Sequence, residues 1–164
     1  METIEAIRTR RSIRKFEKQE VSHELLEQLV DCGRLAPTAN NIQPWEFVVV
    51  TDESVKNRIA AATDHGKFIA DAQAVIAVFC KDTKYYLEDG CAATENILLA
   101  AADLDLGACW VAGDKKPYAA EVSELLNAPR NLKLVSLISL GWPKHKTGQT
   151  KARSLSELIH WEKF

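Results

Sequence analysis

The chain lacks the short motifs that assign many enzymes on their own. It has no GxGxxG motif, so a Rossmann dinucleotide site is unsupported, and it has no GxSxG elbow of the kind that carries a hydrolase serine. The segment GACWVAGDK, residues 107–115, differs from a phosphate-binding P-loop in the spacing of its glycines, and Asp114 stands where that motif requires lysine. The sequence therefore disfavours these nucleotide-binding and hydrolase classes.

Metal-ligand spacing is missing as well. The cysteines contain no CxxC pair, and the histidines share no ligand spacing with one another or with the cysteines. Three of the four cysteines (Cys32, Cys80 and Cys109, with Cys91 as the fourth) lie in apolar segments. Buried, reduced thiols are therefore favoured over disulfides, and no metal site is predicted.

Long apolar runs and a surplus of one charge are also absent. The 164 residues are 46% hydrophobic and 27% charged, with a formal net charge of −2. The N-terminus METIEAIRTR lacks the apolar core of a signal peptide, and Glu95, Asn96 and Asp103 interrupt the alanine-rich stretch 91–104. We therefore expect one soluble cytoplasmic domain, residues 1–164, with no membrane partner and no nucleic-acid partner.

Hydrophobic periodicity predicts helices and strands that follow one another along the chain. Helices are expected at residues 1–9, 22–36, 53–62, 84–106 and 117–127, and strands at 45–51, 74–80, 108–112 and 132–140. The continuous apolar run AVIAVFC indicates a strand buried on both faces. The predicted fold class is α/β (α+β), with a central mixed sheet flanked by helices.

The longest predicted helix, residues 84–106, is apolar around most of its circumference. Such a helix belongs in the middle of an assembly rather than on a surface. Two interpretations stay open on this pattern alone. The helix is either the centre of one monomer or part of a dimer core.

The segment RRSIRKF, residues 10–16, concentrates positive charge in an acidic chain. Four cations surround one hydroxyl, and arginine forks bind a dianionic phosphate bidentately. A second polar segment, PTANNIQPW, residues 37–45, places several hydrogen-bonding side chains between two prolines. It is equally consistent with a binding site for a planar heterocycle and with a polar connecting loop. A third, basic segment follows Gly141, and it is either a solvated loop or a second contact to the same phosphate.

Taken together, the three segments resemble the nitroreductase family of flavin enzymes. RRSIRKF, PTANNIQPW, and GWP followed by Lys151 and Arg153 occur in the family's order between Thr9 and Leu158. The stretch LAAADLDLGACW, residues 99–110, is similar to the family's segment leading into the flavin site. The resemblance implies a nitroreductase-like fold, assembled as an intertwined homodimer with FMN at the interface.

The same resemblance assigns residues to the cofactor. The family's RRSxR motif, which holds the phosphate, ribityl chain and pyrimidine end, corresponds to Arg10, Arg11, Ser12 and Arg14. The second segment, which usually comes from the partner chain, corresponds to Pro37, Thr38, Ala39, Asn41 and Gln43. The remaining matches are Trp110, Val111 and Gly113 near the flavin face or its N5 edge, and Lys151 and Arg153 at the phosphate.

The resemblance implies an NAD(P)H-dependent oxidoreductase that reduces nitroaromatics, quinones or similar small acceptors by a ping-pong mechanism. NADH or NADPH would donate electrons to FMN. No catalytic acid or base is certain, and Arg14, with Arg10 as the alternate, would stabilise the negative charge of the reduced ring. Two alternatives are specialised flavin chemistry on the same fold (flavin fragmentation or reductive dehalogenation) and a non-catalytic module that binds anions or nucleic acid.

The chain is shorter than many members of the family, which leaves no room for a helical excursion over the site. The pocket is therefore expected to be open, or closed by a loop such as 64–71. Phe68, Tyr85 and Tyr86 are the candidates for an aromatic gate.

Overall fold

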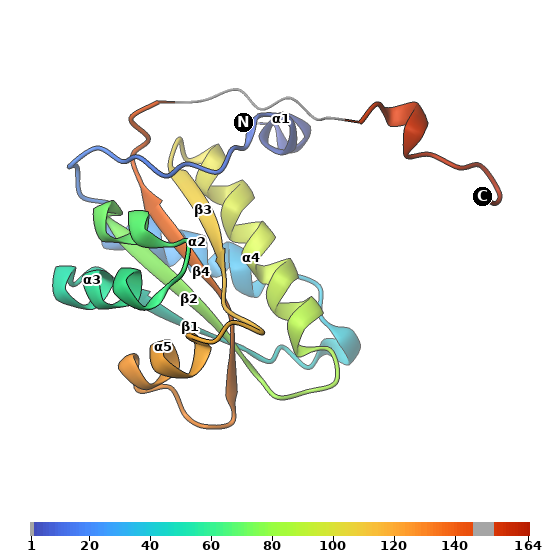
Figure 1. Ribbon diagram of the computed structural model, residues 1–164. Helices are drawn as coiled ribbons and strands as arrows, with labels where there is room; N and C mark the ends of the chain where they lie inside the picture. The colour runs from blue at the N-terminus through green and yellow to red at the C-terminus, as the bar shows by residue number, and fades with distance from the viewer. Residues whose placement is uncertain (1, 146–152) are drawn as a thin grey trace.

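The computed structural model describes residues 2–145 and 153–164. Five α-helices and four strands alternate along this part of the chain, with short 3-10 turns between them (Figure 1). The helices are α1 (Thr3–Thr9), α2 (His23–Arg34), α3 (Glu53–Ala62), α4 (Tyr86–Asp103) and α5 (Ala119–Leu125). The strands are β1 (Trp45–Val50), β2 (Ala74–Lys81), β3 (Gly107–Ala112) and β4 (Leu132–Gly141), and the 3-10 turns are η1 (Ala39–Asn41), η2 (Lys67–Asp71) and η3 (Leu155–Glu157).

The strands form one sheet in the order β1-β2-β4-β3, and every neighbouring pair is antiparallel. The sequence prediction of a mixed sheet is therefore wrong for these four strands. The crossover β2-α4-β3 does join two parallel strands, but β4 lies between them and runs antiparallel to both. In the described part of the chain, parallel pairing is limited to the isolated bridge between Ser12 and Ala108.

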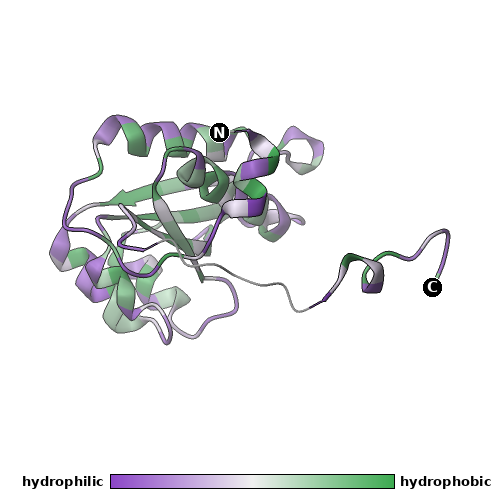
Figure 2. Ribbon diagram, turned by 90° about the horizontal axis from the view of Figure 1, so that it is seen from above, coloured by the Kyte–Doolittle hydropathy of each residue, from purple (hydrophilic) through white to green (hydrophobic). Residues whose placement is uncertain are grey.

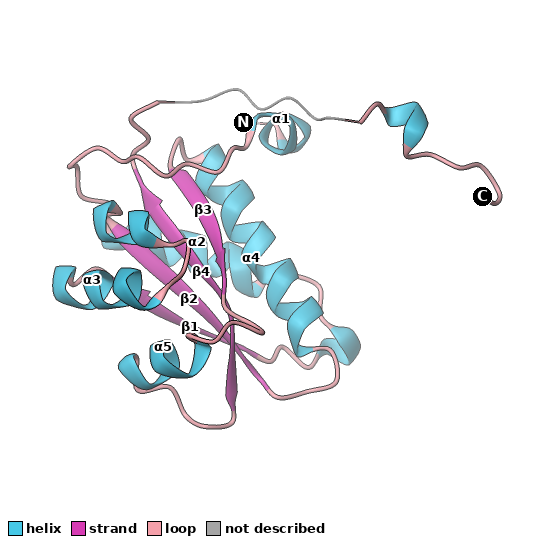
Figure 3. Ribbon diagram, viewed as in Figure 1, coloured by secondary structure: helices cyan, strands magenta, loops and turns pink. Residues whose placement is uncertain are grey.

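Helices cover both faces of the sheet, as Figure 3 shows. Strand β2 divides its side chains between two cores with the two-residue period of a strand. Ala74, Ile76 and Val78 pack in the core with α2 and α4, whereas Val75, Ala77 and Phe79 pack in the core with α3 and α5. The two-faced burial predicted for this strand is confirmed, because residues 74–80 are fully buried.

The element boundaries agree closely with the sequence prediction, and α3 agrees at both ends. The largest difference is α4, which ends at Asp103 instead of near Leu106, because Asp105 takes a left-handed conformation with φ 59°. Ser22, at the start of the predicted helix 22–36, caps α2 by accepting a hydrogen bond from the Leu25 amide. All four cysteines are free, in agreement with the predicted reduced thiols.

Candidate functional site

The N-terminal segment that follows α1 lies along the start of β3. The Ile13 amide donates to the Ala108 carbonyl at 2.9 Å, beside the bridge between Ser12 and Ala108. Gly107 makes this close approach possible, because a Cβ there would lie 2.7 Å from the Ile13 side chain. The predicted residues Arg10, Arg11, Ser12 and Arg14 are therefore held next to this edge strand.

Two arginines of this segment border a cavity of about 260 Å³ between α1 and α4. Arg10 lies 3.5 Å from Glu95 of α4, and Arg11 donates to the carbonyls of Arg8 and Arg10. The Nε of Arg11 is buried and has no hydrogen-bond partner. A buried donor without a partner is costly, so this atom is ready to bind an acceptor.

Arg14 borders a second cavity, of about 210 Å³, against the outer side of β3. Its guanidinium carbon lies 5.6 Å from the centre of the Phe68 ring, within the range of a cation–π contact. The other lining residues are His65, Cys109, Trp110, Val111, Ala112, Lys116 and Tyr118. The sequence prediction that the loop 64–71 borders the site is consistent with this lining, and Phe68 is the gate candidate that it contains.

The protonation of two cavity residues limits the chemistry that the protein can perform alone. Burial raises the pKa of the Cys109 thiol, and this effect outweighs the opposing influence of Arg14 and Ser12. Burial also raises the pKa of Tyr118, whose hydroxyl donates to the Ala112 carbonyl. Neither group ionises near neutral pH, so neither is a ready nucleophile or general base.

The predicted loop 37–43 is held by a buried carboxylate of α4. Asp89 is 5% exposed and accepts hydrogen bonds from the Thr38 hydroxyl at 2.9 Å and from the Ala39 amide at 3.1 Å. The Thr38 hydroxyl in turn accepts from the Gln43 amide, and the Gln43 side chain donates to Asn41. Pro37 is exposed at the start of the loop. The loop therefore presents its amides on a fixed scaffold.

The N-terminal segment and this loop lie at opposite ends of α4 (Figure 1). Asp89 is in the first turns of the helix, whereas Ala108 follows its last turn. At 1.5 Å per residue, the helix separates the two ends by roughly 20 Å. None of residues 37–43 lines either cavity. The predicted site residues are thus brought together within one chain only for the segments 10–14 and 110–113.

Of the two predicted tail residues, Arg153 is described by the structure, and it lines neither cavity. Lys151 lies outside the described residues. Arg153 is exposed and donates to the Glu157 carbonyl within its own tail. Figure 2 shows the tail projecting away from the body of the molecule.

Sequence reasoning missed several residues that the structure places at these sites. Asp89 belongs to none of the three segments singled out in the sequence, yet it anchors the loop. His65 and Lys116 line the second cavity without belonging to any motif. In the sequence, Lys116 could have been noticed as part of the lysine pair that follows GACWVAGD, shortly after the predicted strand 108–112.

Replacing Asp89 with alanine should destabilise the protein by about 2–3 kcal/mol, because two half-buried donors lose their buried acceptor. Affinity for any ligand of the loop should fall as well. Thermal unfolding measures the first effect. Glu88→Ala is the matched control, since that neighbouring carboxylate is exposed. Equal melting temperatures for the two variants would contradict the anchoring role.

None of the helices in residues 2–145 and 153–164 is both long and apolar enough to cross a bilayer. The same part of the chain contains no cluster of three or more metal-ligating side chains.

Comparison with known proteins shows several relatives of this chain. The sequence profile of the Nitroreductase family matches residues 7–91 and 67–142. A protein of Archaeoglobus fulgidus, named for NADH dehydrogenase/NAD(P)H nitroreductase activity, is 36% identical over 99% of this chain and 99% of its own length. A protein of the same description from Methanothermobacter thermautotrophicus is 34% identical over 100% of this chain and 88% of its own length.

Solved structures agree with these sequence matches. A protein of Bacteroides thetaiotaomicron, with the same named activity, superposes with a TM-score of 0.94 at 30% identity, covering 99% of this chain and 98% of its own. A nitroreductase of Desulfovibrio desulfuricans, solved in complex with FMN, gives a TM-score of 0.88 at 33% identity. The match covers 100% of this chain and 98% of the other.

Proposed function

The chain belongs to the nitroreductase family, and we propose that it reduces nitroaromatics, quinones or similar small electron-poor acceptors. FMN is its cofactor and NADH or NADPH is its electron donor. The observation that carries the proposal is the pair of cavities along residues 10–14. One is bordered by two arginines and by Ala108, and the other is bordered by aromatic side chains and by Cys109, the next residue of β3.

The residues present fit FMN at both of its ends. The buried, unpartnered Nε of Arg11 beside Arg10 suits a phosphate, which accepts several charge-assisted hydrogen bonds. Phe68 and Trp110 provide apolar ring surface for a planar heterocycle, and the edge strand β3 places Trp110 and Val111 at the border of the cavity. When bound, FMN supplies hydride-accepting chemistry that no side chain of the cavity offers.

Each part of the chain then has a distinct task. We assign Arg10, Arg11 and Ser12, with Arg153 and Lys151 from the tail, to the phosphate and ribityl chain. Arg14 stabilises negative charge on the reduced ring, while Trp110, Val111 and Gly113 border its reactive edge. Pro37, Thr38, Ala39, Asn41 and Gln43 contact the ring from the other side of the site.

This division of tasks requires two chains. The loop 37–43 and the segment 10–14 lie at opposite ends of α4, so one flavin contacts both only when a second copy supplies the loop. The tail supports the same assembly. Its large apolar side chains are exposed, Trp161 at 81% and Phe164 at 104%, and such surface marks a contact site.

We place the tail of one copy on the groove between α2 and β1 of the other. This groove has a volume of about 470 Å³ and is lined by Leu26, Val30 and Val49, among other residues. Strand β1 is the edge of the sheet here, so its free backbone groups can pair with an added segment. The half-buried side of α4 is a second contact surface in the same homodimer.

Donor and acceptor occupy the same space in turn, which gives ping-pong kinetics. The test is the absorption spectrum of the purified protein with FMN, before and after addition of NADH and NADPH separately. Bleaching of the flavin band, followed by its return when a quinone or nitroaromatic is added, is the expected result. The proposal would be contradicted if the protein neither quenched FMN fluorescence nor gained thermal stability from added FMN.

Arg10→Ala should weaken FMN binding about 10- to 100-fold, equivalent to about 1.5–3 kcal/mol for a charge-assisted contact. Fluorescence titration of FMN measures the change. Glu95→Gln is the matched control, because Glu95 is the present partner of Arg10 and competes with a phosphate for it. The control should bind FMN as tightly as the unaltered protein or more tightly. Unchanged affinity in Arg10→Ala would remove Arg10 from the site.

A further inference from the structure

The cavity against β3 carries more positive charge than the proposed flavin site requires. Three basic residues line it, and they come from three separate segments: Arg14 after α1, His65 before η2, and Lys116 after β3. No aspartate or glutamate is among the lining residues. The proposed function assigns Arg14 to the flavin, which leaves His65 and Lys116 without a task.

The backbone around Lys116 is held in place. The Lys116 amide donates to the Gly113 carbonyl at 3.3 Å, and its own carbonyl accepts from the Ala119 amide at 3.0 Å. The Tyr118 hydroxyl fixes the same turn to Ala112. Lys115, with φ 59°, is exposed and does not line the cavity, whereas Lys116 is half-buried and does. The turn therefore separates two adjacent lysines into one cavity residue and one surface residue.

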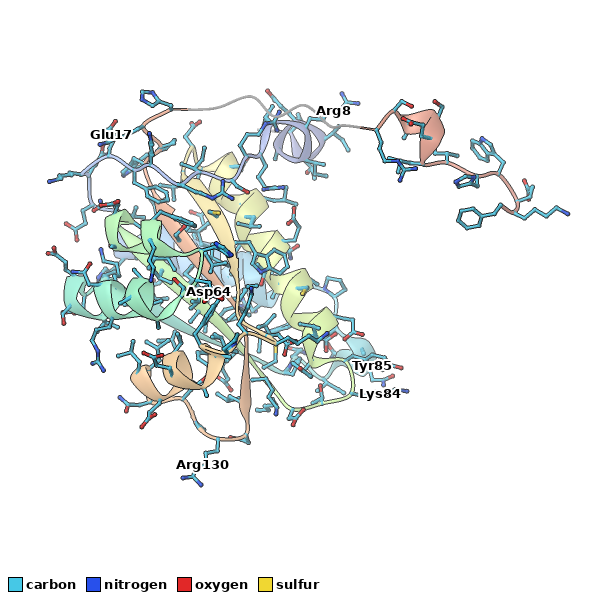
Figure 4. All side chains as sticks on the ribbon, in the orientation of Figure 1. Arg8, Glu17, Asp64, Lys84, Tyr85 and Arg130 are labelled. Atoms are coloured by element: carbon cyan, nitrogen blue, oxygen red, sulfur yellow. The ribbon has the colours of Figure 1, made fainter. Side chains whose placement is uncertain are left out.

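The carboxylates nearest to this turn do not cancel its charge. Asp114 accepts a hydrogen bond from the Tyr86 hydroxyl at 2.7 Å, which directs it toward α4. Asp64, labelled in Figure 4, is exposed beside His65, and its charge helps to raise the pKa of Tyr118. An exposed carboxylate is largely screened by solvent, so the cavity itself keeps a net positive character.

We propose that this cavity selects electron acceptors that carry a carboxylate or sulfonate group, and that Lys116, assisted by His65, recognises that negative charge. The inference rests on the proposed function, since it names the class of acceptor for the same site. Lys116 supplies the charge-assisted contact to such an acceptor, beside the apolar ring surface of Phe68 and Trp110 that the proposed function gives to the flavin. Because this contact exists before any electron moves, the selectivity is expressed in binding.

The test compares para-nitrobenzoate with para-nitrobenzamide, which have similar shapes and differ in charge. Reduction of either nitro group to nitroso consumes one NAD(P)H and one proton and releases NAD(P)⁺ and water. The quantity measured is the ratio of kcat/KM for the acid to kcat/KM for the amide. Comparing this ratio between protein variants cancels the intrinsic reactivities of the two compounds.

Lys116→Gln should lower this ratio about 5- to 20-fold, mainly through KM of the acid, as expected for loss of one charge-assisted contact. The double variant with His65→Gln should lower it further, and added salt should reduce the preference of the unaltered protein. Lys115→Gln makes the same charge change one residue away and should leave the ratio unchanged. An equal ratio in the unaltered protein, Lys116→Gln and Lys115→Gln would overturn the inference.

A second measurement separates this inference from the proposed function. Calorimetric titration of para-nitrobenzoate into the oxidised protein, without NAD(P)H, reports binding alone. Weaker binding by Lys116→Gln than by Lys115→Gln supports the selective role even if neither compound is turned over, whereas equal binding contradicts it. Absence of turnover for every acceptor counts against the proposed function instead.

Discussion

Replacing Arg14 with glutamine should slow reduction of the FMN-loaded protein by NAD(P)H about 100-fold or more. The guanidinium borders the β3 cavity and lies over the Phe68 ring, where the proposed function places the flavin. Reduction leaves negative charge on the ring, and removing one fixed group that stabilises developing charge costs about 10²–10³ in rate. Stopped-flow measurement at saturating donor isolates this step. The midpoint potential of the flavin should fall in the same variant.

Two further variants separate charge from position. Arg14→Lys keeps the charge but loses the planar fork, so its rate should lie between those of the glutamine variant and the unaltered protein. Arg8→Gln removes a cation from the exposed side of α1, where Figure 4 labels it, and should have no effect on the rate. Equal rates for Arg14→Gln and Arg8→Gln would show that Arg14 does not tune the flavin.

Removal of residues 153–164 should convert the homodimer into a monomer that no longer retains FMN. The segment exposes five large apolar side chains, namely Leu155, Leu158, Ile159, Trp161 and Phe164. Burying even two of them on a second copy stabilises the dimer by several kcal/mol, at about 1.5–3 kcal/mol each. Its loss should therefore raise the dimer dissociation constant by more than about 10³-fold. Light scattering coupled to size exclusion, with flavin absorbance recorded alongside, measures both effects.

Point variants in the same tail serve as controls for the deletion. Trp161→Ala should weaken the dimer in part, whereas Lys163→Ala removes an exposed cation of the same tail and should leave it intact. A truncated protein that is still dimeric and still yellow would contradict the assignment of the tail to the second copy.

Most of the fold was predictable because it depends on local patterns. The continuous apolar run of β2 and the start of α2 at Ser22 are local signals, and both are confirmed. The antiparallel sheet order was not predictable, because insertion of β4 between β2 and β3 depends on long-range pairing that leaves no short motif. The sequence prediction of a mixed sheet failed for this reason.

The candidate site was predictable where residues cluster in sequence. The cluster RRSIRKF predicted a basic site, and in the structure this segment borders two cavities. Asp89 was not predictable, since its task depends on contacts with Thr38 and Ala39 across some 50 positions of the chain. Lys116 needed the turn after β3 to distinguish it from Lys115. Both roles depend on contacts between residues that the structure reveals and no short sequence motif records.

The proposal that two chains build each flavin site is tested most directly by a mixed dimer. Arg14→Gln disables the N-terminal contribution and Asp89→Ala disables the loop, so each homodimer should have little activity with NAD(P)H. Co-expression with two different tags, followed by tandem purification, isolates dimers that contain one chain of each kind. Such a dimer contains one site with both unaltered parts, and about half of the unaltered protein's activity should return. If both parts belonged to the same chain, every site would be damaged and the mixed dimer would be as inactive as its parents.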